Sequence, residues 1–298
     1  MASFQNVALL GKGMLGTAIL DQLVNNGFTV TILSRDPSKV TDVPSGVQVV
    51  QVDYSSKNSL VKALKGQDVA IATLGAGATP AQKLIIDASI EAGVKRYIPS
   101  DFGSFTTDLT ARELPLLQSV AAVQDYLREK ADSGALEYTI FSTGAFLDIV
   151  IGSPLLVDLK NHSIELYDQG VNAFSSTSVS TIGKAITNAL KARDATKNRN
   201  VYIHEFVFTQ AKALGIAKKL SPPGTQWTET HADANAVLNQ LIEKAKVNPT
   251  DLSIVYPMIK AALLAGRYKA AYDQVDNELL GIRLLTDAEI EAKIAPLV

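Results

Sequence analysis

The sequence predicts an α/β protein with a Rossmann-type doubly wound parallel sheet and a smaller carboxyl-terminal substrate lobe. Two observations support this prediction. Apolar, β-branched runs alternate with helical patterns through the first half of the chain. A glycine-rich turn, GKGMLG at residues 11–16, joins the first run to the first helical pattern. Strands that are apolar throughout are typical of burial on both faces, and helical crossovers make neighbouring strands parallel.

The first half contains six expected strands, all rich in residues that suit a buried pleated surface. They are VALLG (7–11), FTVTILS (28–34), VQVVQVD (47–53), DVAIATLG (68–75), RYIPS (96–100) and EYTIFST (137–143). Helices are expected between them at about residues 14–25, 57–65, 80–92 and 113–131. Because no repeat or low-complexity break interrupts this alternation, we expect one Rossmann domain over residues 1–150.

The alternation loosens after residue 150, where we expect residues 151–298 to form mostly a substrate-binding lobe. Residues 166–186 are polar and rich in turn formers, 200–208 indicate one more strand, and 221–227 indicate a loop. The patterns of 229–246 and 249–272 are helical, and the capping box TDAE, Thr286 to Glu289, opens a last helix. Part of this half is expected to return to the main sheet.

Composition narrows the classes of partner. The 28 basic and 30 acidic residues are well mixed and give a formal charge of -2, which favours a small-molecule partner over nucleic acid or an anionic membrane. The chain has no cysteine, which excludes disulfides, thiolate zinc sites and a thiol nucleophile. Its three histidines lack metal-ligand spacing, so no metal site is predicted.

The amino terminus MASFQNVALLG lacks the charged region, long apolar core and cleavage site of a secretion signal, so a cytoplasmic protein is expected. The most apolar long window, residues 135–156, contains Glu137, Asp148 and Pro154, so no membrane span is predicted. The sequence leaves the oligomeric state open.

The GKGMLG turn has the spacing of a dinucleotide-binding loop. Gly11 permits a tight turn after the first strand, Gly13 lets the backbone approach a pyrophosphate, and Gly16 lets helix and strand pack closely. The amino terminus of the following helix would then face the phosphates with unpaired N–H groups. The spacing alone also occurs in ordinary turns, but a strand before it and a helix after it favour dinucleotide binding.

The end of the second strand indicates which dinucleotide is bound. Ser34 occupies the position where an acid would hold the ribose of NAD, and Arg35 follows it, which favours the 2′-phosphate of NADPH. Asp36 precedes Pro37 and is expected to start a turn and point away. The residues expected around the cofactor are Gly11, Lys12, Gly13, Met14, Leu15, Gly16, Ser34, Arg35, Lys39, Asp53, Tyr54, Leu74, Gly75, Ala76, Pro99, Ser100, Thr143, Gly144 and Phe146.

Several motifs together resemble the NmrA-like, isoflavone-reductase-like branch of the atypical short-chain dehydrogenases/reductases, especially its fungal members. They are GKGMLG, SRDPSK, VDYSSKNSLVKALKGQDVAIATLG, QKLIIDASIEAGVKRYIPSDFGSF and YTIFSTGAFLDI. YIPSDFG is the most specific, being similar to F-x-P-S-E-F-G with Asp101 in the Glu position. The resemblance covers most of residues 5–190 and implies a Rossmann domain, NADPH, and reduction of aromatic or conjugated small molecules. GKGMLG departs from the family's G-x-T-G-x-x-G form.

The resemblance also implies a catalytic lysine on the helix after the fifth strand, but this chain has Val120 at that position. Tyr126 and Lys130 offer an alternative, because they have the Y-x-x-x-K spacing in which an ammonium lowers the pKa of a phenol. ADSG ends the helix directly after Lys130, which favours a lysine placed at the helix carboxyl end.

Ser100 and Thr143, at the ends of the fifth and sixth strands, are the other candidate catalytic residues, since a developing oxyanion needs hydrogen-bond donors. Both would equally suit strand-end caps. The expected aromatic pocket for substrate contains Phe102, Phe105, Phe146, Tyr167 and Phe174.

Two functions fit these residues. The first is an NADPH-dependent reductase of a small aromatic or conjugated metabolite. The second is a non-catalytic NAD(P)-sensing regulatory protein, as some NmrA-like members are, and the missing lysine favours it. The aromatic residues of the pocket and the closer match to reductase-like motifs favour the enzyme.

Overall fold

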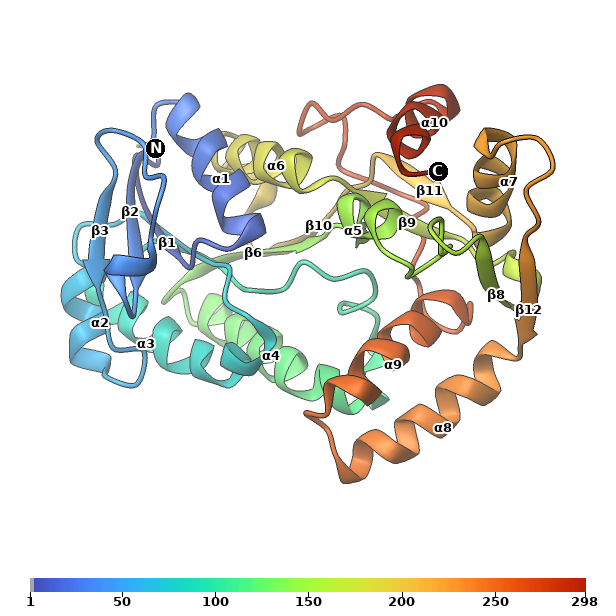
Figure 1. The fold of residues 1–298 in the computed structure, drawn as a ribbon. Coiled ribbons are helices and arrows are strands. Elements are labelled where there is room, and N and C mark those ends of the chain that lie inside the picture. Colours follow the sequence, from blue (N-terminus) through green and yellow to red (C-terminus); the bar gives the residue numbers. More distant parts are fainter. Residues whose placement is uncertain (1–2) are drawn as a thin grey trace.

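A seven-stranded parallel sheet lies at the centre of the computed structural model, which describes residues 3–298 apart from the side chain of Ala76 (Figure 1). The strand order is β10-β6-β5-β4-β1-β2-β3, and every neighbouring pair is parallel. The bounds are β1 Asn6–Leu10, β2 Thr29–Ser34, β3 Gln48–Gln51, β4 Val69–Ala72, β5 Arg96–Ile98, β6 Glu137–Ser142 and β10 Arg199–Tyr202. The six strands expected in the first half are confirmed.

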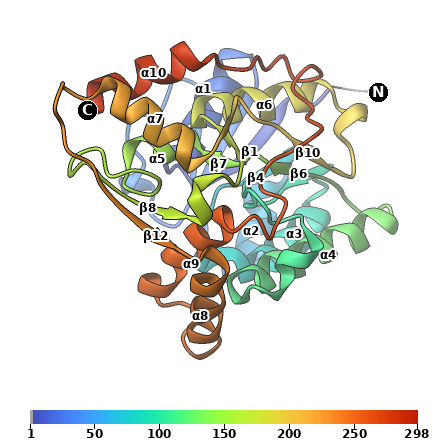
Figure 2. The same ribbon diagram turned by 90° about the vertical axis from the view of Figure 1, so that its right-hand side faces the viewer.

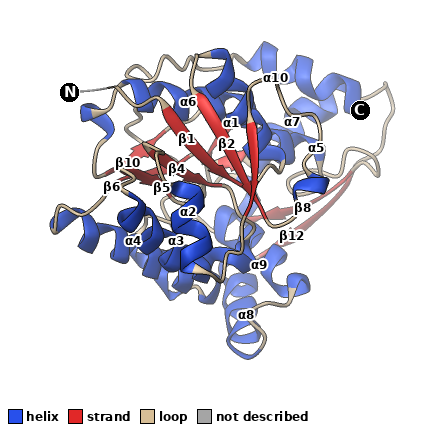
Figure 3. Cartoon of the chain, turned by 90° about the vertical axis from the view of Figure 1, so that its left-hand side faces the viewer, coloured by secondary structure: helices blue, strands red, loops and turns tan. Residues whose placement is uncertain are grey.

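Helices cover both faces of this sheet. Helices α1 (Met14–Asn25) and α6 (Val179–Lys191) lie on one face, and α2 (Lys57–Leu64), α3 (Gln82–Ala92) and α4 (Gln118–Asp132) lie on the other (Figure 3). The residues of strand β1 explain why both faces of the sheet are covered. Val7 and Leu9 belong to the core under α1 and α6, whereas Ala8 and Leu10 belong to the opposite core. Successive side chains alternate between faces, so a strand that is apolar at every position needs a helix layer on each side. The doubly wound fold is confirmed.

The strand order reverses beside β1. The chain runs from β1 through β2 to β3 on one side and then returns to place β4 on the other side of β1. In open α/β sheets, ligands bind in the crevice outside the carboxyl ends of the strands at such a reversal. The glycine-rich turn follows β1 directly, so it lies at this crevice.

The second half of the chain completes the main sheet. Strand β10 pairs with β6, and α6 packs against α1, where a Cβ on Gly183 would lie only 2.6 Å from the Ala18 carbonyl oxygen. Residues 166–186, expected to be turn-rich, therefore contain β9 (Phe174–Thr177) and part of α6.

One expected strand, residues 200–208, is divided between two sheets. After β10, the N–H of Ile203 still bonds to Ser142, but the N–H of Glu205 bonds to Ser176 of β9. The chain thus leaves the main sheet at His204 and continues as β11 (Phe206–Phe208), in a three-stranded sheet ordered β11-β9-β7.

The remaining elements form a lobe at the carboxyl ends of the main strands (Figure 2). They are β7 Ala145–Phe146, β8 Ser163–Tyr167, β12 Thr228–Ala232, α5 Leu147–Gly152, α7 Gln210–Leu220, α8 Ala234–Val247, α9 Leu252–Leu264 and α10 Asp287–Ile294. Two expected helices are shorter than predicted. Residues 229–232 pair with β8, so α8 begins only after the Asp233 cap, and α9 ends before Gly266, whose φ is +63°. The capping box at Thr286 is confirmed. No helix within residues 3–298 is long and apolar enough to cross a bilayer.

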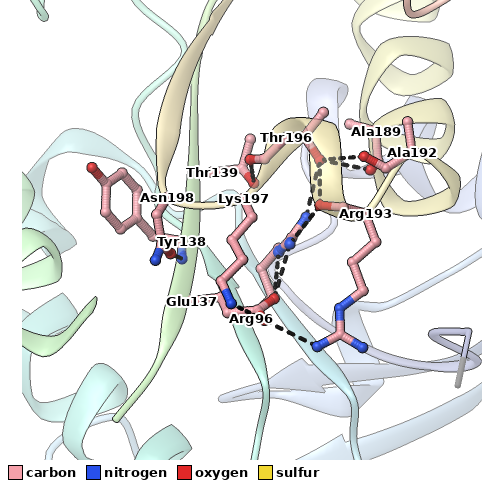
Figure 4. A network of polar contacts seen from close by, with 10 residues as sticks. All are labelled: Arg96, Glu137, Tyr138, Thr139, Ala189, Ala192, Arg193, Thr196, Lys197 and Asn198. Atoms are coloured by element: carbon pink, nitrogen blue, oxygen red, sulfur yellow. Dashed lines mark hydrogen bonds and ion pairs between the residues drawn. The ribbon is translucent and has the colours of Figure 1, made fainter. Parts of the chain in front are cut away.

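A buried ion pair fastens the amino end of the sheet (Figure 4). Arg96 opens β5 and is 0% exposed, and its guanidinium lies 2.8 Å from the carboxylate of Glu137, which opens β6. The guanidinium also donates to the Thr196 hydroxyl and the Arg193 carbonyl, between α6 and β10. Burial alone would raise the pKa of Glu137, but hydrogen bonds from Arg193, Arg96 and Lys197 hold that pKa below its usual value.

Glu137→Leu is expected to lower the free energy of unfolding by about 3 kcal/mol, because it leaves the buried Arg96 without its charge partner. Lys197→Ala removes a half-exposed partner of the same carboxylate and should cost less than about 1 kcal/mol. Urea denaturation of the two variants measures the difference. Equal losses would show that the buried pair does not fasten the sheet.

Candidate cofactor and substrate site

The three glycines of the turn after β1 serve different purposes. Gly11 has a φ of +102°, which L side chains rarely adopt, and a Cβ there would lie 3.0 Å from the Thr73 carbonyl oxygen. A Cβ on Gly16 would overlap the Gly11 carbonyl and lie 2.8 Å from the Thr73 hydroxyl. At Gly13, by contrast, no heavy atom from another part of the described chain lies within 4 Å of the Cβ position. Gly11 and Gly16 therefore permit close packing, whereas Gly13 leaves open space.

Helix α1 begins at this open space without a side-chain cap. Its N-cap is Gly13, no side chain bonds to the first turn, and that turn contains no acidic residue. Leu15 is buried, whereas Met14 is 54% exposed beside the turn. Unpaired N–H groups and a partial positive charge at a helix amino terminus suit a phosphate. The turn thus fits the pyrophosphate of a dinucleotide.

Thr73, directly after β4, holds this turn in place. Its hydroxyl lies 2.9 Å from the Gly11 carbonyl oxygen and 3.2 Å from that of Leu10. Thr73 was not predicted as a site residue, although its place near the carboxyl end of the expected strand 68–75, at the sheet edge where the glycine turn lies, is a signal that could have identified it.

The end of β2 presents one unpaired cation. The Asp36 carboxylate accepts hydrogen bonds from the N–H and hydroxyl of Ser38 and caps a short 3-10 helix, so it is turned away as expected. Lys39 lies 3.6 Å from the same carboxylate. The Ser34 hydroxyl lies against Asp36 main-chain atoms. Arg35 is exposed, and within residues 3–298 its guanidinium makes no hydrogen bond or ion pair.

The adjacent loops contain the other residues expected around the adenosine. Lys12 donates to the Thr41 carbonyl at 2.7 Å and so bridges the glycine turn to the loop after β2. Tyr54 donates to the Leu33 carbonyl, and burial raises its pKa while the neighbouring Arg35 opposes that rise. The Asp53 carboxylate is occupied by the N–H and hydroxyl of Ser55.

The ends of β4, β5 and β6 are joined by side-chain hydroxyl groups. Ser100 donates to the Leu74 carbonyl at 2.6 Å, next to Gly75 and Ala76, and its N–H bonds to the buried Gln82. Thr143 is fully buried and donates to the Phe102 carbonyl at 2.8 Å. Both hydroxyl protons are therefore engaged by backbone oxygens.

An apolar cavity of about 410 Å³ lies beside these strand ends. Its walls come from the loop after β5, the segment before α4, the segment after β6, and helices α5 and α9. None of its lining side chains in the described chain is charged. It is lined by Phe102, Gly103, Ser104, Phe105, Thr106, Leu116, Leu117, Gly144, Ala145, Phe146, Ile149, Val150, Leu155, Tyr256, Ile259 and Leu263.

Tyr272 joins two walls of this cavity. Its hydroxyl donates to the Ser104 carbonyl at 2.7 Å and accepts the N–H of Gly144 at 3.0 Å. Gly144 has a φ of +68°, and a Cβ there would overlap the Ser175 carbonyl. Tyr272 was not predicted as a site residue, because it ends a segment that was expected to be helical.

Not every expected site residue lies at the cavity. Phe102, Phe105 and Phe146 line it, but Tyr167 and Phe174 lie in the lobe core, where Phe174 is 0% exposed and stacks on Phe208. Both were assigned to the pocket because they were expected in the lobe over the strand ends. A position in the lobe does not reveal which face of a strand is buried.

The candidate catalytic residues on helix α4 do not face the cavity. Tyr126 donates to Asp87 of α3 at 2.5 Å, and Lys130 lies 4.4 Å from the Tyr126 ring centre in the last turn of α4. The Tyr126 hydroxyl thus bonds to the neighbouring helix instead of facing the strand ends. Val120 is half-buried against the lobe core and does not line the cavity.

A family model described as NAD(P)H-binding matches residues 11–192. The chain belongs to the NAD(P)H-binding family. Oxidoreductase aprR of Aspergillus flavus is 34% identical over 287 residues, which cover 95% of each chain. Oxidoreductase poxI of Penicillium oxalicum is 29% identical and covers 96% of this chain and 92% of that protein. Isoflavone reductase homolog P3 of Arabidopsis thaliana is 34% identical over 46% of each chain.

Solved structures with low sequence identity share the fold of this NAD(P)H-binding chain. An isoflavone reductase superposes with a TM-score of 0.76 at 19% identity, over 99% of this chain and 100% of that chain. An NADPH-dependent quinone oxidoreductase of Escherichia coli, complexed with NADPH, gives 0.74 at 19% identity, over 98% and 99%. The family confirms that the chain binds NAD(P)H, and the relatives matched over more than nine-tenths of their length place it among oxidoreductases. The names of these relatives do not support the sensor alternative.

Gly13→Ala is expected to weaken NADPH binding at least about tenfold while leaving the melting temperature unchanged, since its Cβ would fill only the open phosphate space. Gly16→Ala should instead lower the free energy of unfolding by about 2 kcal/mol, because its Cβ meets backbone. Calorimetric titration and thermal denaturation distinguish the two effects. Tight binding by Gly13→Ala would contradict the assigned phosphate position.

Proposed function

We propose that this oxidoreductase reduces a small, neutral, aromatic or conjugated metabolite with NADPH. The observation that carries the proposal is the apolar cavity without a charged lining, beside the ends of β5 and β6. A charged substrate would lose its hydration there without gaining a partner, whereas flat apolar rings would be well accommodated. The lobe, mostly residues 151–298, encloses the substrate side.

The preference for NADPH is supported by Arg35. Within residues 3–298 its guanidinium has no hydrogen bond or ion pair, and the adjacent acid, Asp36, accepts hydrogen bonds from Ser38. A 2′-phosphate would therefore meet a cation without a free carboxylate beside it, next to the Ser34 hydroxyl, whose proton is donated to the Asp36 carbonyl. Solved structures of the same fold include one described as AtPrR2 with NADP⁺ and (+)pinoresinol.

Each part of the cofactor would be held by a different loop. The turn from Gly11 to Gly16 would hold the pyrophosphate, Ser34, Arg35 and Lys39 the 2′-phosphate, and Asp53 and Tyr54 the adenine. Leu74 to Ala76, Pro99, Ser100, Thr143, Gly144 and Phe146 would border the nicotinamide, which supplies a hydride when NADPH is bound. The chain itself must orient the substrate in the cavity and exclude water from it.

Negative charge that develops on a substrate oxygen needs a donor other than a lysine at position 120. Ser100 and Thr143 are poor proton donors, because both hydroxyls donate to carbonyl oxygens. In this proposal, they fix the strand ends instead. Ser104 also lines the cavity, and its hydroxyl has no hydrogen-bond partner within residues 3–298. We therefore assign to the Ser104 hydroxyl the role of hydrogen-bond donor to the developing charge on the substrate oxygen. Ser104 was not predicted as a site residue from the sequence.

Arg35→Asp is expected to weaken NADPH binding by about 100-fold and leave NADH binding within about threefold, since only the 2′-phosphate is repelled. Fluorescence titration with both cofactors measures the ratio. Lys39→Asp, at the second cation assigned to the 2′-phosphate, should have a smaller effect, because Lys39 is already paired with Asp36. An unchanged preference for NADPH in Arg35→Asp would overturn the assignment.

Ser104→Ala is expected to lower kcat roughly 100-fold with 1,4-naphthoquinone or chalcone as the conjugated probe, because one donor to the developing oxyanion is lost. NADPH binding should be unaffected. Ser119→Ala, beside the position of the absent lysine, is the matched control and should keep kcat within about twofold, since Ser119 does not line the cavity. Equal kcat in wild type and Ser104→Ala would exclude Ser104 as the donor.

A further inference from the structure

A buried polar cluster lies behind the loop that forms one wall of the cavity. Asp101 follows β5 and is 5% exposed, and Gln124 on α4 is 1% exposed. The Gln124 amide nitrogen donates to the Asp101 carboxyl oxygen Oδ2 at 2.7 Å and to the Thr106 carbonyl at 3.0 Å. Gln124 thus links the carboxyl group of Asp101 to the cavity wall.

The hydrogen bonds of this cluster leave acceptors in excess. Both amide protons of Gln124 are used, yet Asp101 Oδ1, Gln124 Oε1 and Thr106 Oγ1 are buried without partners. The Thr106 hydroxyl and the Gly103 N–H are the other donors near the Asp101 carboxyl, and a Thr106 proton given to Asp101 leaves Gln124 Oε1 without a donor. Buried acceptors without donors are costly, so one further proton is required. A proton on Asp101 Oδ1 would supply it.

The surrounding charges do not favour an ionised Asp101. Arg128 on α4 is the cation that acts on it, and that guanidinium is partly exposed and already lies 2.8 Å from Asp125. The hydroxyl of Tyr272, in the C-terminal segment, is titratable but neutral, because burial raises its pKa, and it donates to the backbone carbonyl of Ser104. Burial raises the pKa of Asp101, against weaker opposition from its hydrogen bonds and Arg128.

We propose that Asp101 is a neutral carboxylic acid paired head to head with the Gln124 carboxamide, and that this pair positions the Gly103–Thr106 wall of the cavity. Asp101 is a positioning residue: it acts through Gln124 on the Thr106 backbone. The acid donates from Oδ1 to Gln124 Oε1 and accepts at Oδ2, so both groups are satisfied without a buried charge. This inference rests on the proposed function only in taking the cavity as the substrate site.

The protonation state can be measured without turnover. In protein labelled with carboxyl-¹³C aspartate, the Asp101 resonance is identified by its absence in Asp101→Asn. We expect that resonance to stay at the carboxylic-acid position from about pH 5 to about pH 8, whereas exposed aspartates titrate near pH 4. A carboxylate signal at neutral pH would overturn the proposal.

The positioning role is tested with the neutral apolar dye N-phenyl-1-naphthylamine, whose fluorescence reports binding in the cavity. Asp101→Asn keeps one donor and one acceptor, so its dissociation constant should stay within about twofold of wild type. Asp101→Ala and Gln124→Leu leave buried groups unpaired, so dye binding should weaken roughly tenfold. NADPH binding should not change in any of these variants.

Asp21→Asn, on an exposed position of α1, is the control for the loss of one carboxyl group. If Asp101→Asn bound the dye as poorly as Asp101→Ala, a charged carboxylate would be required and the proposal would fail. It would also fail if Asp101→Ala bound the dye like wild type. Failure of the proposed reduction, by contrast, would appear as absent turnover with these dye constants unchanged.

Discussion

The close approach of α1 to the turn after β1 is the constraint on which the cofactor site depends. At Gly16 there is no room for a side chain between the helix and the Gly11 carbonyl, and the Thr73 hydroxyl closes the contact from β4. This packing fixes where α1 begins, so the open space at Gly13 faces the carboxyl ends of the strands. The site therefore forms at the reversal of strand order, because β4 must lie beside β1 to provide Thr73.

The two halves of the site have different chemistry. The side at the glycine turn has backbone N–H groups and the exposed Arg35, which suit anions, whereas the cavity proposed for the substrate is apolar and bordered by hydroxyl groups and a tyrosine. Tyr272 and the Asp101–Gln124 pair both hold the loop after β5, one from the C-terminal segment and one from α4. A wall held from two sides would orient a ring without contributing charge, as the proposed hydride transfer to a neutral acceptor requires.

The sequence predicted the first half well because strands buried on both faces and crossover helices follow local rules of periodicity. It failed where distant partners decide the structure. Residues 229–232 look helical, but they form β12 because β8 offers them a partner. His204 carries no signal that the chain changes sheets there. Gly11, Gly13 and Gly16 follow from the spacing of the glycine turn, whereas Thr73 and Tyr272 hold their places through contacts between segments far apart in the sequence. Ser104 is distinguished only by its position in the cavity wall. Phe174 was assigned to the pocket because its burial cannot be inferred from its type.

The position of β10 at the edge of the main sheet affects how the chain folds during synthesis. The sheet needs residues 199–202, and α6 must cover α1, so the first 150 residues leave the ribosome with β6 unpaired on one side and the apolar face of α1 uncovered. An uncovered strand edge is prone to pair with another chain. The stretch between β6 and β10 thus sets a period during which the nascent chain is vulnerable to aggregation, and a fragment ending near residue 150 would keep that exposed edge permanently.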